Sequence, residues 1–156
     1  MYEVLSIGEA LMDFIPLDAE KLTAAEQAEM AGLDERTLPI PLFEQSVGGS
    51  PANVACALAR LGVKTGFVGK VGNDSLGRQV ERVLSDCGVD TKNLILSEEL
   101  RTPVAVVHHE DGKKSFTFYR GGQTADSHFE EEDIDDEIFD DCKVFNFSSF
   151  PLSREP

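Results

Sequence analysis

The sequence lacks the features that mark several large classes of protein. Basic residues are scarce: 14 lysines and arginines stand against 29 aspartates and glutamates, and the formal net charge is −15. Nucleic acids and anionic membranes are bound through basic patches, so neither is expected as a partner. No apolar run approaches the length of a membrane span, and the N-terminus lacks a signal peptide's charged and apolar regions. We therefore expect a cytoplasmic protein.

Cysteine is also sparse. Cys56, Cys87 and Cys142 are far apart and form no CxxC motif. An odd, scattered set predicts reduced, buried thiols and neither a zinc site nor a disulfide framework. Histidine offers no metal centre, because His108 and His109 are neighbours on a predicted strand and would point to opposite faces of it.

Common signatures of nucleotide and calcium sites are missing as well. A dinucleotide-binding fold requires Gly-x-Gly-x-x-Gly after the first strand, where only Gly8 stands. The sequence contains no Gly-Lys-Ser/Thr P-loop. The acidic stretch 130–141 lacks the central glycine and the ligand spacing of an EF-hand. It is better explained as the solvated face of a short helix.

The apolar residues that are present predict one α/β domain. A chain of 156 residues is long enough to bury a sizeable core. Buried strands are expected at 2–7, 63–71 and 144–150, and helices at 52–61 and 76–87. Strands that alternate with glycine turns and helices are the βαβ pattern of a parallel sheet.

A different period appears in the segment 104–120. Its alternating residues and the Asp-Gly pair at 111–112 predict a β-hairpin. Alternation places Phe116, Phe118 and Arg120 on one face of the second strand. Such a row could lie over a polar ligand, or it could simply cover the core with its arginine at the rim.

A glycine turn that leads into a helix is the most informative stretch. Gly48 and Gly49 can take backbone angles closed to other residues and let a ligand approach the main chain. Ser50 is expected to cap the helix, with Pro51 in its first turn. The free N–H groups there suit oxygen-rich ligands, and the amide of Asn53 both donates and accepts, as a sugar hydroxyl does. A turn without a ligand, before an alanine-rich core helix, fits the pattern equally well.

Asp13 is another candidate ligand-binding residue. It follows the first strand in an otherwise apolar stretch, and open α/β sheets bind ligands beyond the carboxyl ends of their strands. A carboxylate can accept hydrogen bonds from two hydroxyls at once. The alternative is a loop aspartate that stabilises a local turn.

Taken together, these motifs resemble the ribokinase-type (PfkB) carbohydrate kinases, and most of all their fructokinase branch. The motifs that carry the resemblance are Gly-Glu-x-x-x-Asp at 8–13, Gly-Gly-x-Pro-Ala-Asn-Val-Ala at 48–55, Val-Gly-Lys-Val-Gly-Asn-Asp at 68–74, and Phe-Tyr-Arg at 118–120 with Ala125-Asp126. The spacer 121–124 is one residue longer than is usual in the family.

The resemblance implies a ribokinase-like fold, with a mostly parallel sheet flanked by helices and a small β-sheet lid. Lid elements are expected at about 14–46 and 102–122, and lids of this kind could pair in a homodimer. Residues 17–46 are longer than the family needs and are interpreted as an insertion, with a possible short helix from Thr23 to Ala31.

The resemblance also assigns roles to particular residues. Asp13 and Asn53 would hold sugar hydroxyls, and Phe118 would cover the sugar ring. Arg120 would bind a hydroxyl or an anionic end of the substrate. The substrate-binding residues implied in this way are Asp13, Gly48, Gly49, Asn53, Phe118 and Arg120. ATP and Mg²⁺ are the implied cofactors, at a site mostly outside this chain.

The family's Gly-Ala-Gly-Asp motif, which carries the catalytic base, is absent from the 156 residues. Residues 1–156 therefore correspond to the N-terminal, sugar-binding part of one ribokinase-like domain, and no catalytic residue is assigned. Three hypotheses remain: a kinase that converts fructose to fructose 6-phosphate, a 2-keto-3-deoxygluconate kinase in which Arg120 meets the acid, and a non-catalytic sugar-binding fragment.

Overall fold

The computed structural model describes residues 1–17, 26, 29, 32, 43–110, 113–140 and 142–148. Two four-stranded sheets, called sheet A and sheet B, make up its framework. The expected helix from Thr23 to Ala31 and the hairpin turn at 111–112 lie outside the described residues, apart from single positions.

Sheet A is entirely parallel and has the strand order β5-β4-β1-β8. Its strands are β1 (Tyr2–Ile7), β4 (Thr65–Gly72), β5 (Asp90–Ser97) and β8 (Cys142–Phe147). The strands predicted at 2–7, 63–71 and 144–150 are confirmed, the last two with ends shifted by one to three residues. The prediction missed β5, because it begins with four polar residues and lies at the edge of the sheet.

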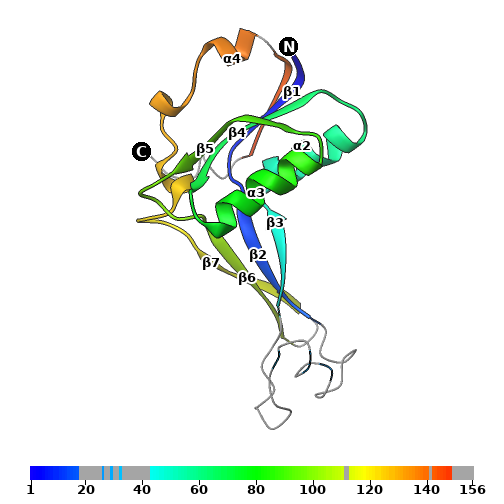
Figure 1. The fold of residues 1–156 in the computed structure, drawn as a ribbon, viewed down its shortest axis with the longest axis vertical. Coiled ribbons are helices and arrows are strands. Elements are labelled where there is room, and N and C mark those ends of the chain that lie inside the picture. The colour runs from blue at the N-terminus through cyan, green and yellow to red at the C-terminus, as the bar shows by residue number, and fades with distance from the viewer. Residues whose placement is uncertain are drawn as a thin grey trace.

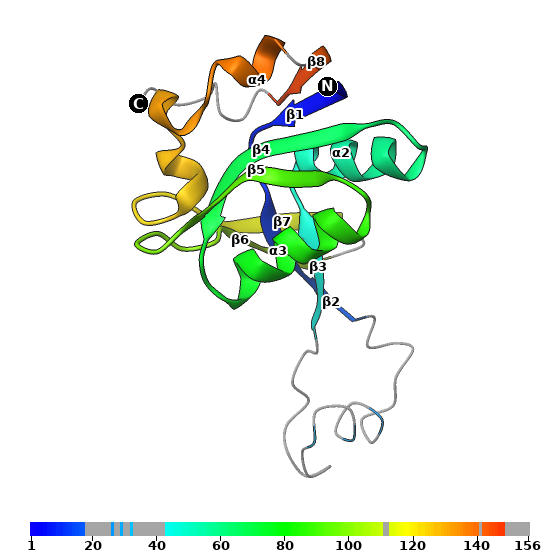
Figure 2. The same cartoon turned by 45° about the horizontal axis from the view of Figure 1, so that its top comes forward.

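Two helices cover one face of sheet A, as both views show (Figures 1 and 2). They are α2 (Ser50–Arg60) and α3 (Ser75–Asp86), close to the predicted bounds. Between them and the sheet lies the main core, which includes Phe67 and Val71 from β4 and Leu84 from α3, each fully buried. The hydroxyl of Ser6 donates to the carbonyl oxygen of Pro51 at 2.8 Å and joins β1 to the start of α2.

The segment after sheet B crosses to the other side of sheet A. It contains the short helices η2 (Ala125–His128), η3 (Glu131–Asp133) and α4 (Glu137–Asp140), so the acidic stretch forms two short helices where one was expected. Phe129 and Ile138 pack against a second cluster built on Leu5 and Val68. Lys70 holds the segment in place, because its ammonium group lies 2.8 Å from a carboxylate oxygen of Asp133.

Sheet B is mixed and has the order β3-β2-β6-β7. Its strands are β2 (Leu11–Pro16), β3 (Phe43–Gly48), β6 (Val104–Glu110) and β7 (Lys113–Tyr119). The predicted hairpin is confirmed as β6 and β7. The alternative that Asp13 is a loop aspartate is contradicted, because Asp13 lies within β2. This strand was not predicted, since its partner strands β3 and β6 are distant in sequence and leave no local signal.

The ends of α2 correct one detail and confirm another. Gly49, with φ of 103°, is the N-cap, so Ser50 begins the helix and makes no side-chain cap. At the other end Gly62 has φ of 86°, and the N–H of Val63 donates to the carbonyl oxygen of Leu58 at 3.1 Å. This 6→1 bond is the helix termination that a glycine favours, as predicted.

Asp74 joins α3 to sheet B. One carboxylate oxygen accepts the N–H groups of Leu76 and Gly77 at 3.0 and 2.9 Å, which makes Asp74 the predicted N-cap. The same carboxylate accepts from the N–H and the hydroxyl of Thr102 at 3.0 and 2.8 Å, just before β6. Burial alone would raise the pKa of Asp74, but these hydrogen bonds outweigh it and lower the pKa below its ordinary value.

The three thiols are free, as the scattered cysteines predicted, but only Cys87 is fully buried, whereas Cys56 and Cys142 are partly exposed. Burial, together with the neighbouring thiol of Cys87, raises the pKa of Cys56 to about 12, so this thiol is neutral at physiological pH. In the described part of the chain, every helix is too short or too polar to cross a membrane.

Asp74→Ala should lower the free energy of unfolding by about 2–3 kcal/mol, because a helix cap and buried hydrogen bonds are lost together. Urea unfolding followed by circular dichroism measures this loss.

Asp86→Ala removes the same charge from an exposed position of the same helix and should change the free energy of unfolding by less than about 0.5 kcal/mol. Because the folded-state pKa of Asp74 is lowered, its contribution should be complete above the ordinary pKa of about 3.9 and disappear as pH falls through the lower folded value. Equal losses in the two variants, or a contribution that does not change with acid, would refute this role.

Candidate functional site

A cavity of about 210 Å³ lies where sheet B meets the N-terminus of α2. Its walls come from the β1–β2 connection and β2, from the start of α2, and from β7 with its end, so it joins three separate stretches of the sequence. The residues that line it are Glu9, Leu11, Asp13, Gly49, Ser50, Phe116, Phe118 and Arg120.

The register of sheet B explains why Asp13 and Phe118 share this cavity. Asp13 pairs with Ala105 on β6, and Ala105 pairs with Phe118 on β7. Residues directly opposite one another in a sheet point to the same face. Adjacent strands lie about 4.8 Å apart, so Asp13 and Phe118 are separated by about two strand spacings, with the small Ala105 between them.

The carboxylate of Asp13 lies directly over Gly48. A β-carbon on Gly48 would overlap Oδ2 of Asp13 and would come within 2.8 Å of its Cγ. Gly48 thus makes room for the acid group, although it is not itself part of the cavity wall. Burial raises the pKa of Asp13 above its ordinary value, and the nearby ammonium of Lys114 opposes this only in part.

Gly49, between β3 and α2, packs against the β1–β2 connection, where the chain crosses from sheet A to sheet B. Its φ of 103° is strained for any residue with a side chain, and a β-carbon there would overlap the carbonyl oxygen of Glu9. The side chain of Glu9 also joins the β1–β2 connection to the start of α2 and to the end of β8. Oε1 of Glu9 accepts the N–H of Ser50 at 3.3 Å, and Oε2 accepts the hydroxyl of Ser148 at 2.7 Å.

The predicted alternation along β7 is confirmed, because Phe116, Phe118 and Arg120 all line the cavity. The two phenylalanine rings stack with centroids 5.9 Å apart, and each is about half exposed. Lys114 extends this row, with its ammonium 5.3 Å from the centre of the Phe116 ring. The cavity therefore has one aromatic wall that is open to solvent.

Arg120 reaches the cavity from the end of β7 and forms an ion pair with Asp126. The longer spacer between them does not prevent this contact. It closes into a tight loop in which the N–H of Gly121 donates to the hydroxyl of Thr124 at 2.9 Å. The N–H of Ala125 then donates to the carbonyl oxygen of Arg101 at 2.9 Å, which anchors the loop to the β5–β6 connection.

The structure thus brings together most of the residues that the sequence singled out. Asp13, Gly49, Phe118 and Arg120 line one cavity, and Gly48 adjoins it. Asn53 lies in the first turn of α2, where its side chain is exposed and does not line the cavity in this structure. Its binding role stays a prediction.

Sequence reasoning missed three residues of the cavity wall as ligand-facing groups, namely Glu9, Leu11 and Ser50. Glu9 stood in a quoted motif, but its position beside Gly49 depends on the fold of β2 away from sheet A. Phe116 was predicted to share the face of Phe118 and Arg120, but it was not assigned as a substrate-binding residue.

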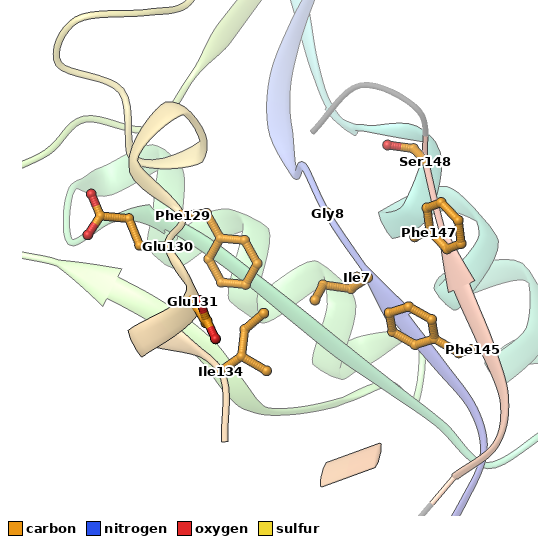
Figure 3. Close-up of a pocket in the computed structure, with 9 residues that line it drawn as sticks. All are labelled: Ile7, Gly8, Phe129, Glu130, Glu131, Ile134, Phe145, Phe147 and Ser148. Atoms are coloured by element: carbon orange, nitrogen blue, oxygen red, sulfur yellow. The ribbon is translucent and has the colours of Figure 1, made fainter. Parts of the chain in front are cut away.

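A second, larger hollow of about 410 Å³ lies on the opposite side of sheet A from α2 and α3. In Figure 3, Phe129 and Ile134 from the returning segment face Ile7 and Phe145 across it. The wall is mostly apolar, and the edge strand β8 leaves Phe147 55% exposed. An open apolar hollow beside a sheet edge is a surface that other polypeptide can cover.

The smaller cavity has the chemistry of a site for a polyhydroxylated ligand. Two carboxylates accept hydrogen bonds, an arginine donates them, and an aromatic wall can contact the C–H face of a ring. In contrast, the described residues include no group of three or more histidine, cysteine or acidic side chains arranged to hold a metal ion.

Comparisons with known proteins agree with this chemistry. Residues 1–155 match the profile of the pfkB family carbohydrate kinases. The chain is 37% identical over 154 residues to fructokinase-1 of Oryza sativa subsp. japonica, which covers 98% of the chain and 43% of that relative. The crystal structure of a fructokinase from Xylella fastidiosa superposes with a TM-score of 0.78 at 32% identity, over 96% of the chain and 42% of that protein.

An uncharacterized sugar kinase from Pyrococcus horikoshii, solved in complex with ATP, gives a TM-score of 0.78 at 33% identity. The match covers 98% of this chain and 45% of that one, so the chain spans less than half the length of its relatives. The predicted ribokinase-like α/β fold is confirmed for the part that is present. The chain belongs to the pfkB family of carbohydrate kinases.

Proposed function

We propose that these residues form the sugar-binding part of a kinase that transfers the γ-phosphoryl group of ATP to a primary hydroxyl of fructose. The observation that carries the proposal is the cavity that joins Asp13, Phe118 and Arg120 at the N-terminus of α2. Its volume of about 210 Å³ suits a monosaccharide, and fructokinases are among the relatives of the chain.

Each of the proposed binding residues has a distinct part in holding the sugar. Asp13, as a carboxylate, accepts hydrogen bonds from two sugar hydroxyls, and the missing side chain of Gly48 leaves room for it. Phe118 covers one face of the sugar ring. Arg120 donates to a hydroxyl, and Asn53 turns inward to reach another when the sugar is bound.

Sheet B is the part of the proposed kinase that closes over the sugar. Its β7 strand carries the exposed phenylalanines, and closure would shut water out of the site and protect ATP from hydrolysis. Pairing of two such sheets in a homodimer is part of the same proposal, since β7 is an edge strand and can add a further strand.

Phosphoryl transfer needs groups that these residues do not supply. The small cavity carries two carboxylates and an arginine already paired with Asp126, which does not suit a triphosphate with its metal ion. We propose that the ATP site and the catalytic base belong to the remaining length of the family fold. That part would pack against the apolar hollow beside β8 and complete the site.

A 2-keto-3-deoxygluconate kinase is the second candidate, because Arg120 is a basic residue in the wall of the cavity. A sugar-binding fragment without catalysis is the third candidate. The chain covers 43% of the rice fructokinase and 42% of the Xylella fructokinase, and this partial coverage favours the third candidate for the isolated residues.

Asp13→Asn should raise the KM for fructose of the active gene product by about 10- to 100-fold, because an amide replaces a charged acceptor of sugar hydroxyls. Steady-state phosphorylation with ATP measures the change. Asp136→Asn, which removes an exposed acid outside the cavity, is the matched control and should leave the KM within about twofold of the wild type. An unchanged KM in a folded Asp13→Asn variant would rule out the assigned role.

The affinity for fructose should also fall as the pH is lowered. The fall should begin at a higher pH than it would if Asp13 had the pKa of an ordinary aspartate. Burial raises the pKa of Asp13, so its carboxylate takes up a proton, and loses an acceptor position, above the ordinary value of about 3.9. Isothermal titration of fructose into the protein from pH 7 to pH 4 tests this. The Asp13→Asn variant should show a flatter profile, and identical profiles would contradict the prediction.

The apolar hollow should be covered in a longer gene product. A cysteine introduced as Phe147→Cys should react rapidly with a maleimide in the isolated 156 residues and slowly in a product that includes the rest of the fold. Leu61→Cys, at an exposed site after α2, should react equally in both. Equal reactivity of Phe147→Cys in the two proteins would show that the second part packs elsewhere.

A further inference from the structure

Arg120 and Asp126 form a buried ion pair beside the candidate cavity. Their side chains are 9% and 2% exposed, and both Nε and Nη2 of Arg120 face Oδ2 of Asp126. The other oxygen, Oδ1, is buried and has no hydrogen-bond partner among the described residues. The carboxylate of Asp126 is therefore held chiefly by Arg120, and two opposite charges cancel within one small, buried volume.

Asp126 is fixed in this place by its surroundings. It lies in η2, whose N-terminal residue Ala125 donates its N–H to the carbonyl oxygen of Arg101 at 2.9 Å. At the other end, the carbonyl oxygen of His128 accepts from the ammonium of Lys70 at 3.0 Å. The segment is thus held to the β5–β6 connection at one end and to β4 of sheet A at the other. The charge of Asp126 is a built feature of the cavity wall and not a passing contact of a surface loop.

This pairing decides the charge that the cavity presents to a ligand. Among the described residues that line the cavity, Arg120 is the only basic one, whereas Glu9 and Asp13 are acidic. Lys114 lies beyond the lining, over the Phe116 ring, where it attracts the carboxylate of Asp13. Once Asp126 has cancelled the charge of Arg120, the cavity wall is negative. A substrate carboxylate placed there would meet like charges, which disfavour it.

We propose that Asp126 is a specificity-determining residue, whose ion pair with Arg120 makes the cavity select a neutral ketohexose over a 2-keto-3-deoxy sugar acid. The inference rests on the proposed sugar kinase function and names its substrate class. Asp126 acts through Arg120: it fixes where the guanidinium lies and cancels the positive charge that a sugar acid would need.

Asp126→Asn is the direct test, because asparagine keeps the shape and an acceptor for Arg120 but removes the negative charge. The active gene product is assayed with ATP and either D-fructose or 2-keto-3-deoxy-D-gluconate. The wild type should prefer fructose, and the variant should shift the ratio of the two kcat/KM values toward the acid by about tenfold or more. Asp136→Asn is the matched control, since it removes the same charge from an exposed position outside the cavity and should leave the ratio unchanged.

A folded Asp126→Asn variant with an unchanged ratio would overturn the inference and leave the fructokinase function intact. A wild type that prefers the acid would overturn it too, whereas a wild type that uses neither substrate would contradict the proposed function as well. If thermal unfolding shows that Asp126→Asn does not fold, Arg120→Gln decides the matter. The carboxylate of Asp126 is then uncancelled, so the ratio should move further toward fructose, and equal losses for both substrates would overturn the proposal.

Discussion

The contact between Gly49 and the backbone of Glu9 is the constraint on which the site depends. At this point the chain leaves the parallel sheet A and enters sheet B, while the N-terminus of α2 comes against it from the other side. No side chain fits at Gly49, and its positive φ suits glycine. The close approach places the helix N-terminus, the carboxylate of Glu9 and, four residues further along β2, that of Asp13 around one cavity.

The rest of the molecule holds sheet B in that position. Asp74 caps α3 and accepts two hydrogen bonds from Thr102, so the helix that covers sheet A also fixes the start of β6. The pairing register of β6 and β7 then places Phe118 in the cavity wall. The anchored loop after β7 places Asp126 beside Arg120. Fold and site are therefore stabilised by the same few contacts, and a change at Asp74 acts on both.

The sequence predicted those parts of the fold that have a local cause. The glycine turn, α2 and α3, the strand β1 and the β6–β7 hairpin each have a period or cap that can be read from neighbouring residues, and the face shared by Phe116, Phe118 and Arg120 follows from alternation alone. Three features could not be read in this way. β2 and β3 are strands only because they pair with partners distant in sequence. The N-cap of α2 depends on the carboxylate of Glu9. The ion pair of Arg120 with Asp126 depends on how the spacer 121–124 folds. Long-range contacts decided all three.

The central claim is that these residues bind the sugar while the groups that transfer the phosphoryl lie in the rest of the family fold. The most direct test combines the intact mass of the native protein with an assay of the same sample for ATP-dependent phosphorylation of fructose. We expect the activity to belong to a species well above the 17.1 kDa of these 156 residues. An active species with a mass of 17.1 kDa would contradict the claim, because the catalytic groups would then lie within the chain described above.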